Sequence, residues 1–300
     1  MRQTEADDPR YMGPLTSLAP PESNYVLHAR PHDLYARPAF RAIVDPLFPP
    51  ARLRSFRERT GVDLAEVDEA IVAHLGDGAY LIVARHERAR DIVVAAGMRM
   101  QRVEVAADRP FVRRLGYLGR SLRELVAIGD DLLVLGVNAG PQVARLLRIL
   151  ASGRSPRGPL AGEDGVRLAA FHPRAPLRLY APKPLGLPPD TGVGLLFARE
   201  RAACVAIDPA GEHLNIWTLV LGELPPGAEA NLRELFRSLG GTELGAAVGV
   251  DRALASLEVD VGEERAILNL HWPATALARG LRVLLVDELA ALVDEPVFAE

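Results

Sequence analysis

Lysine is almost absent from this 300-residue sequence, because Lys183 is its only lysine and arginine supplies the rest of the positive charge. Lys183 lies between two prolines, where we expect neither a Schiff-base lysine nor the lysine of a phosphate-binding loop. The arginine bias runs through the whole chain together with abundant alanine, glycine and proline. It indicates a high-GC bacterial coding sequence.

Cysteine and long apolar runs are also missing. The single cysteine, Cys204, excludes an intramolecular disulfide and a cysteine-based metal cluster, and its apolar neighbours predict a small buried side chain. No apolar run approaches the length that spans a bilayer, and residues 1–22 lack the apolar core of a signal peptide. As written, the chain is expected in the cytoplasm. It is expected in the periplasm, or anchored to the envelope, if an N-terminal signal has been removed or lies outside the sequence.

The remaining composition is that of a globular protein. Hydrophobic residues make up 49% and charged residues 25% of the chain, which predicts a packed core. The net charge of -4 provides no general attraction to phosphate backbones, so nucleic acid is not an expected partner.

The hydrophobic pattern predicts an α+β fold of antiparallel sheets with helices packed on one face of each. Segments that alternate with period two recur with helical stripes of period 3.6. Residues 1–22 lack such a pattern and are expected to form a disordered tail. We expect an N-terminal α+β lobe at 23–152, a linker rich in Gly, Pro, Ser and Arg at 153–165, and a C-terminal α+β lobe at 166–300.

The two lobes repeat the same order of predicted elements, which is hairpin, helix, strands and helix. A fixed offset pairs the hairpin at 71–81 with the one at 205–215, and it also pairs Leu147-Arg148 with Leu281-Arg282. This self-similarity predicts a tandem duplication of a ββαββα-like unit. The helices that begin near Pro141 and Pro273 would then be equivalent, and the second is expected to run toward Val293.

Three short segments carry a resemblance to a known class of proteins. They are residues 33–38 (Asp-Leu-Tyr-Ala-Arg-Pro), residues 61–64 (Gly-Val-Asp-Leu) and residues 138–141 (Asn-Ala-Gly-Pro). With these segments the chain resembles uncharacterised lipoprotein-type proteins of high-GC bacteria. The resemblance implies an envelope location and α+β lobes, and it implies no catalytic residues. The sequence departs from that class because it has no N-terminal lipobox cysteine.

The densest group of chemically useful side chains follows the first predicted strand. Arg30, His32, Asp33 and Arg37 form a candidate polar cluster, with His28 at the preceding strand end. Two imidazoles beside a carboxylate could act as a general base or bind a metal. Pro31 interrupts the segment and no third histidine lies nearby, so we expect a polar cluster and no metal.

Other motifs favour structural interpretations. The turn at residues 136–141 could bind an anion at a helix start, but the sequence contains neither GxGxxG nor GxxxxGK[ST], and it contains no GxSxG. Asp130-Asp131 and Glu263-Glu264 are expected in exposed turns. Two groups of arginines are interleaved with acids and are expected to form solvated ion pairs. These groups are Arg52, Arg54, Arg57 and Arg59, and Arg109, Arg113, Arg114, Arg120 and Arg123.

The sequence therefore predicts a non-catalytic binding or structural protein without a cofactor or metal, whose partner is a protein or an apolar ligand. Two alternatives stay open. One is an enzyme with its site around Arg30, His32, Asp33 and Arg37. The other is a carrier of lipids or other apolar ligands in the cell envelope, in which apolar sheet faces enclose a cavity.

Overall fold

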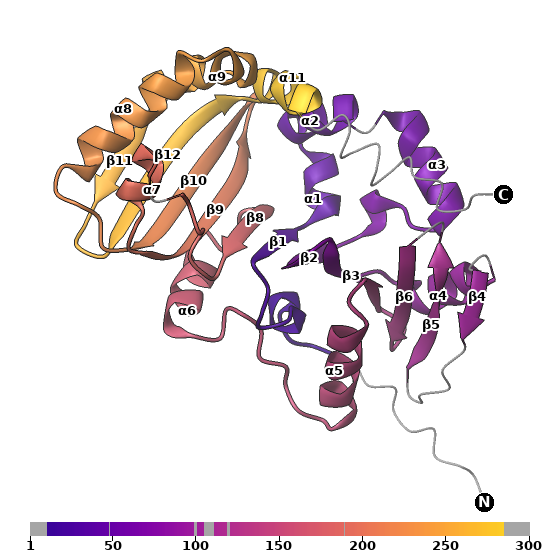
Figure 1. The fold of residues 1–300 in the computed structure, drawn as a ribbon. Helices are drawn as coiled ribbons and strands as arrows, with labels where there is room; N and C mark the ends of the chain where they lie inside the picture. Colours follow the sequence, from indigo (N-terminus) through magenta and orange to yellow (C-terminus); the bar gives the residue numbers. More distant parts are fainter. Residues whose placement is uncertain are drawn as a thin grey trace, which may run out of the picture.

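One continuous antiparallel sheet runs through the whole molecule (Figure 1). The computed structural model describes residues 11–47, 49–98, 101–104, 111–118, 121–188 and 190–284. These residues form a 12-stranded sheet with the order β11-β12-β10-β9-β8-β1-β2-β3-β7-β6-β5-β4. The α+β class with antiparallel pairing is confirmed. The two halves share this one sheet, because β1 of the first half pairs with β8 of the second.

The elements follow the sequence pattern closely. The strands are β1 (Tyr25–Ala29), β2 (Glu69–Gly76), β3 (Ala79–Arg85), β4 (Gln101–Glu104), β5 (Val112–Leu118), β6 (Ser121–Ile128), β7 (Leu132–Val137), β8 (Leu177–Ala181), β9 (Glu200–Ala210), β10 (His213–Gly222), β11 (Glu258–Val261) and β12 (Arg265–Pro273). The α-helices are α1 (Pro31–Ala36), α2 (Pro38–Leu47), α3 (Pro50–Thr60), α4 (Ala89–Gly97), α5 (Gly140–Ala151), α6 (Glu163–Ala170), α7 (Gly192–Leu196), α8 (Ala228–Gly240), α9 (Glu243–Val248), α10 (Val250–Ala253) and α11 (Ala274–Leu284). Short 3-10 turns form η1 (Leu15–Leu18), η2 (Leu64–Glu66) and η3 (Leu254–Ser256).

Turn residues explain where several of these elements begin and end. Asp77 and Gly78 adopt positive φ angles of 49° and 68°, which suits the tight turn between β2 and β3. Gly61 ends α3 in the left-handed conformation, with a φ of 76°. Pro38 and Pro50 begin α2 and α3, where a missing N–H costs no helical hydrogen bond.

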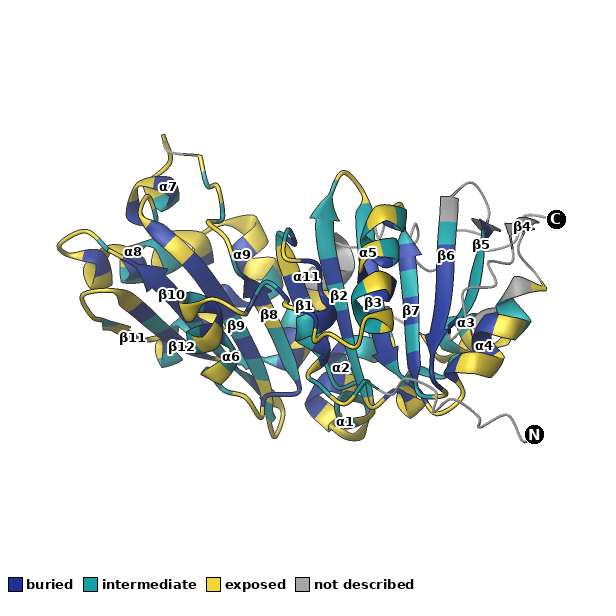
Figure 2. Cartoon of the chain, turned by 90° about the horizontal axis from the view of Figure 1, so that it is seen from below, coloured by how far each residue is buried: buried dark blue, intermediate teal, exposed yellow. Residues whose placement is uncertain are grey.

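Helices cover both faces of the sheet, which corrects the expectation of one covered face. Val126 of β6 packs with Val143 of α5, whereas its neighbour Leu125 packs with Val93 of α4. Because side chains alternate along a strand, α4 and α5 lie on opposite faces. We call the face that carries η1, α5 and α6 the lower face, and Figure 2 shows α5 and α6 in front of it. Helices α2, α4, α8 and α11 pack on the opposite face.

The order of strands is similar on the two sides of the β1–β8 contact. Strands β2, β3, β7 and β6 follow β1, and strands β9, β10, β12 and β11 follow β8. The helices after the first hairpins, α4 and α8, lie on the same face, but α5 and α11 lie on opposite faces. Asn138, with a φ of 50°, lies between β7 and α5, whereas α11 follows β12 directly. The two final helices therefore pack differently, and a duplication stays a prediction.

The expected disordered tail is wrong for its described part. Residues 11–22, which we call the N-terminal strap, lie along the lower face, and η1 inserts Leu15 and Leu18 into the main core. Leu15 is 0% exposed and Leu18 is 2% exposed. Only Leu15 and Leu18 anchor this segment. Two apolar residues in so short a segment give no apolar periodicity, so the sequence pattern did not predict that it docks. Residues 1–10 and 285–300, including the predicted helix end near Val293, lie outside the described residues.

The expected linker also packs on the protein. Gly158 lies so close to the backbone of Thr16 and Ser17 that a Cβ atom there would overlap with it. Pro156, Gly158 and Leu160 are buried, and α6 already begins at Glu163. The strap and the linker thus form a second layer over the centre of the lower face.

Candidate functional site

The predicted polar cluster lies around the junction of β1 and α1, and its side chains bond within the cluster and to carbonyls from distant parts of the chain. Arg30 Nε is 3.3 Å from Asp33 Oδ2, and its guanidinium also donates to the carbonyl of Arg174. His32 is exposed and its Nδ1 is 3.0 Å from the carbonyl of Ala65. Arg37 is exposed at the end of α1. These contacts close the β1–α1 junction, and a catalytic role for the cluster stays a prediction.

His28 belongs to a different group, because it points to the lower face. It is 3% exposed, and its Nε2 is 2.7 Å from Glu69 Oε1. Arg178 donates to His28 Nδ1 at 3.1 Å. Since arginine can only donate, Nδ1 accepts and the ring proton lies on Nε2, facing Glu69. The hydrogen bond from His28 lowers the pKa of Glu69 below its usual value, in spite of the opposing effect of burial.

This buried network continues to the N-terminal strap. Arg85 Nε is 3.4 Å from Glu69 Oε2, and its two terminal nitrogens donate to the carbonyls of Tyr11 and Gly13 at 3.2 and 2.9 Å. The same guanidinium is 3.5 Å from Asp131 Oδ2. Side chains of β8, β1, β2 and β3 therefore hold the start of the strap in place. We interpret the network as positioning, because each group is engaged by a protein neighbour.

A groove lies between the strap, α5 and the linker. Its first cavity has a volume of about 660 Å³ and is lined by residues 17–21 of the strap, by Gln142, Arg145, Leu146 and Ile149 of α5, and by residues 154–157 of the linker. A second cavity of about 530 Å³ adjoins it and shares Ser17 and residues 154–156. Volumes of this size are typical of sites for small molecules. We call the two cavities together the strap groove.

The floor of the strap groove is apolar. Leu18 and Leu146 are almost fully buried beneath the first cavity, and Ile128 and Leu150 line the second. Leu146 faces the groove because α5 lays a stripe of Val143, Leu146 and Leu147 on β6 and β7. Ile128 belongs to β6, so the sheet itself contributes to the floor.

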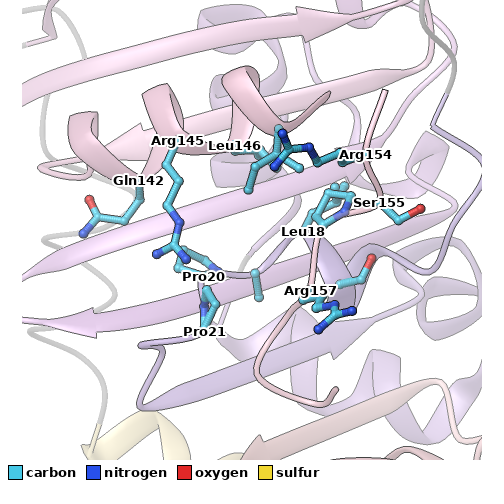
Figure 3. Close-up of a pocket in the computed structure, with 13 residues that line it drawn as sticks. Leu18, Pro20, Pro21, Gln142, Arg145, Leu146, Arg154, Ser155 and Arg157 are labelled. Carbon is cyan, nitrogen blue, oxygen red and sulfur yellow. The ribbon is translucent and has the colours of Figure 1, made fainter. Parts of the chain in front are cut away.

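Arginines surround the mouth of the groove. Figure 3 shows Arg145 extending from α5 toward Pro20 and Pro21, while Arg154 reaches back from the linker to lie beside Leu146. Arg157 lines the cavity from the linker side. Among the residues that the structure describes, no Asp or Glu lines either cavity.

The other predicted sites have protein-internal explanations. At the turn of residues 136–141, a Cβ on Gly140 would lie 3.6 Å from Glu124 Oε2, so an internal carboxylate occupies the space beside the start of α5. Arg113 Nε donates to Glu124 Oε1 at 2.5 Å, but burial dominates and raises the pKa of Glu124. Arg57 pairs with Asp63 at 2.9 Å, as an ion-pair surface requires. Arg109 and Arg120 lie outside the described residues.

Cys204 is a core residue. It is 0% exposed on β9 and packs in the main cluster of the lower face. Burial raises the pKa of its thiol to about 12. A thiol with this pKa is protonated at neutral pH and is a poor nucleophile.

The sequence indicated the parts of the strap groove but not their assembly. The apolar stripe of α5 and the arginines of the linker were both visible. No sequence signal showed that the strap returns across them, because the groove forms between segments more than a hundred residues apart. Arg145, Arg154 and Arg157 were thus missed as candidate residues.

Comparisons with known proteins identify the fold. No protein-family model and no curated protein sequence matches this chain. Solved structures of the treponemal protein TP0453 do match: crystal form III has a TM-score of 0.57 at 7% identity and covers 91% of this chain and 99% of that one. Crystal form IV has a TM-score of 0.55 at 8% identity, covering 89% of this chain and 95% of that one. At this identity, the likeness shows a shared fold.

No helix in the described part of the chain combines the length and the apolar character needed to cross a membrane. A cluster of three or more His, Cys, Asp or Glu side chains able to hold a metal is likewise absent from those residues.

Proposed function

We propose that this chain is a non-catalytic binding protein and that the strap groove holds an elongated apolar ligand. The observation that carries the proposal is the pair of adjoining cavities over an apolar floor. The two cavities share Ser17, Arg154, Ser155 and Pro156 in their lining, so a ligand that extends from one into the other would pass these residues. An elongated chain could follow this path with its sides against Leu18, Leu146 and Leu150.

Chemistry at the groove favours binding over catalysis. The described residues of its lining include no histidine, cysteine or carboxylate, so they supply none of the usual general bases and none of the usual acids other than tyrosine. The strongest buried polar network, around His28 and Glu69, lies behind the strap and positions it. A preformed apolar site with a few polar groups at its mouth is typical of a carrier.

An envelope location is part of this proposal. It is supported by the resemblance of the sequence to lipoprotein-type proteins and by the fit of the groove to an apolar ligand. Fractionation of cells that express the full-length gene product, with detection by antibody, would test it. Recovery in the cytoplasmic fraction alone would contradict the envelope location and leave the ligand proposal intact.

The ligand proposal is tested by blocking the groove. A neutral apolar dye, N-phenyl-1-naphthylamine, should gain fluorescence on binding to the wild-type protein. Ser155→Trp places a large ring on an exposed linker residue that lines both cavities, and we expect it to weaken dye binding at least tenfold. Ala151→Trp is the matched control, because Ala151 is exposed at the end of α5 and lines neither cavity.

The outcome separates the strap groove from other apolar surfaces. Equal dye binding by wild type and Ser155→Trp would place the dye elsewhere and refute the proposal. Native mass spectrometry of the purified protein would add the mass of any ligand that co-purifies. A bound mass that is present in wild type and in Ala151→Trp, and lost in Ser155→Trp, would support the groove as its site.

A further inference from the structure

The cationic mouth of the strap groove is unusual for this protein. The chain contains 39 Asp and Glu residues against 35 Lys and Arg, so an arginine in it ordinarily finds an acidic neighbour. Many do, as Arg57 does with Asp63 and Arg201 with Asp164. The described lining of the groove instead contains three arginines and no acid.

The side chains of two of these arginines are unpaired within the described part of the chain. Among the residues that the structure describes, neither Arg154 nor Arg157 makes a side-chain hydrogen bond or an ion pair. The third, Arg145, is 3.5 Å from Glu22 Oε2 at an exposed position. Guanidinium groups present five donors in a planar fork that matches carboxylate and phosphate oxygens. The guanidinium groups of Arg154 and Arg157 therefore offer positively charged hydrogen-bond donors to a ligand at the mouth of the groove.

We propose that the ligand of the strap groove carries a terminal oxyanion, a carboxylate or a phosphate monoester, and that Arg154 and Arg157 bind it. This inference rests on the proposed function, because it concerns the same groove. The apolar chain lies on the buried floor at Leu18 and Leu146, and the charged head lies at the mouth between the exposed arginines. An apolar floor with a cationic mouth matches an amphipathic anion, because the chain of such a ligand is buried and its charged head stays at the solvent-exposed arginines.

The position of Arg154 adds to the argument. Its side chain points from the linker toward Leu146 (Figure 3), so its charge lies on the side of the groove where the apolar floor is. An arginine stem can cover apolar surface while its head stays in water. An arriving anion would meet this head before its chain reaches the floor. Arg154 lines both cavities, so the same head serves a chain in either one.

The test compares ligands that share one chain and differ in their heads. Dodecanoate, dodecyl phosphate and dodecanol, each below its micellar concentration, would compete with N-phenyl-1-naphthylamine for the wild-type protein. Inorganic phosphate alone would show whether the head binds without a chain. The same series would be run on the double variant Arg154→Gln with Arg157→Gln. Arg148→Gln is the control, because Arg148 is exposed on α5 and lies outside the groove lining.

We expect wild type and Arg148→Gln to bind the two anions at least tenfold more tightly than dodecanol, which corresponds to about 1.4 kcal/mol. The double variant should lose this preference and bind dodecanol as wild type does. Circular dichroism would check that each variant is folded. Unchanged dodecanol affinity in the double variant is the stronger check, because it shows an intact groove.

Each contrary result is distinct. Equal wild-type binding of dodecanol and the two anions would overturn the oxyanion inference and leave the proposed function standing. Displacement of the bound anions by inorganic phosphate at similar concentrations would also overturn it, because the head alone would then account for binding. Retention of the anion preference in the double variant would exclude Arg154 and Arg157 as its cause. If no chain displaces the dye, the proposed function itself fails.

Discussion

Leu15 provides the sharpest test of the N-terminal strap, which the sequence predicted to be disordered. Its side chain is 0% exposed and packs in the main core cluster with residues of β2 and β3, such as Ile71 and Leu81. Leu15→Ala removes three carbon groups from this environment. At about 0.8 kcal/mol for each buried methylene equivalent, the transfer cost alone is about 2.4 kcal/mol. The cavity that remains raises the expected loss to between about 2.7 and 5 kcal/mol.

Urea denaturation followed by tryptophan fluorescence would measure this loss, since Trp217 and Trp272 both lie in the sheet. Met12→Ala is the matched control within the strap, because Met12 is 84% exposed, and it should change the free energy of unfolding by less than about 0.5 kcal/mol. A loss for Leu15→Ala as small as that of the control would refute the docked strap. The strap groove would then lack one wall, and the proposed function would lose its basis.

Three further predictions concern the core and its ionisable groups. In the same urea experiment, Leu147→Ala in α5 should lower the free energy of unfolding by about 2 to 5 kcal/mol. Arg148→Ala is the control, because Arg148 is exposed, and it should lower the free energy of unfolding by less than about 0.5 kcal/mol. Similar losses for the two variants would mean that the apolar stripe of α5 is misassigned. Cys204 should not react with a thiol reagent in the native protein, since burial raises its pKa to about 12, and should react in urea; rapid native labelling would contradict its burial. Because the bond from His28 lowers the pKa of Glu69 in the folded state, this carboxylate contributes stability that is fully present above its ordinary value of 4.5 and is lost as pH falls through the lowered value. Glu69→Gln should therefore show a smaller loss of stability in acid than wild type, and an unchanged slope would mean that the pair contributes nothing.

Local elements were largely predictable from the sequence. The hairpins of β2 with β3 and of β9 with β10, and the helices that begin near Pro141 and Pro273, appear where their periodicity and turn residues indicated. Each of these signals acts over a few neighbouring residues. Alternation determines which side chains share a strand face, and proline and glycine determine where a helix can begin or end.

The candidate polar cluster shows where such reasoning stops. Arg30, His32, Asp33 and Arg37 are close in sequence, and Arg30 pairs with Asp33, but Arg30 and His32 also bond to the distant carbonyls of Arg174 and Ala65. Arg178 comes from β8, and its hydrogen bond to His28 depends on the pairing of β1 with β8. Pairing between strands that are about 150 residues apart leaves no local pattern.

The sequence by itself determined the α+β class, most strands and helices, and the absence of a disulfide, because these follow from local periodicity, turn chemistry and composition. The tertiary structure decided that the halves share one sheet, that α5 and α11 take opposite faces, and that the strap covers the lower face. These features depend on which apolar surfaces meet, and burial is non-directional, so it does not specify a partner by itself. Arg145, Arg154 and Arg157 line one groove only because the strap, α5 and the linker pack next to one another on the lower face.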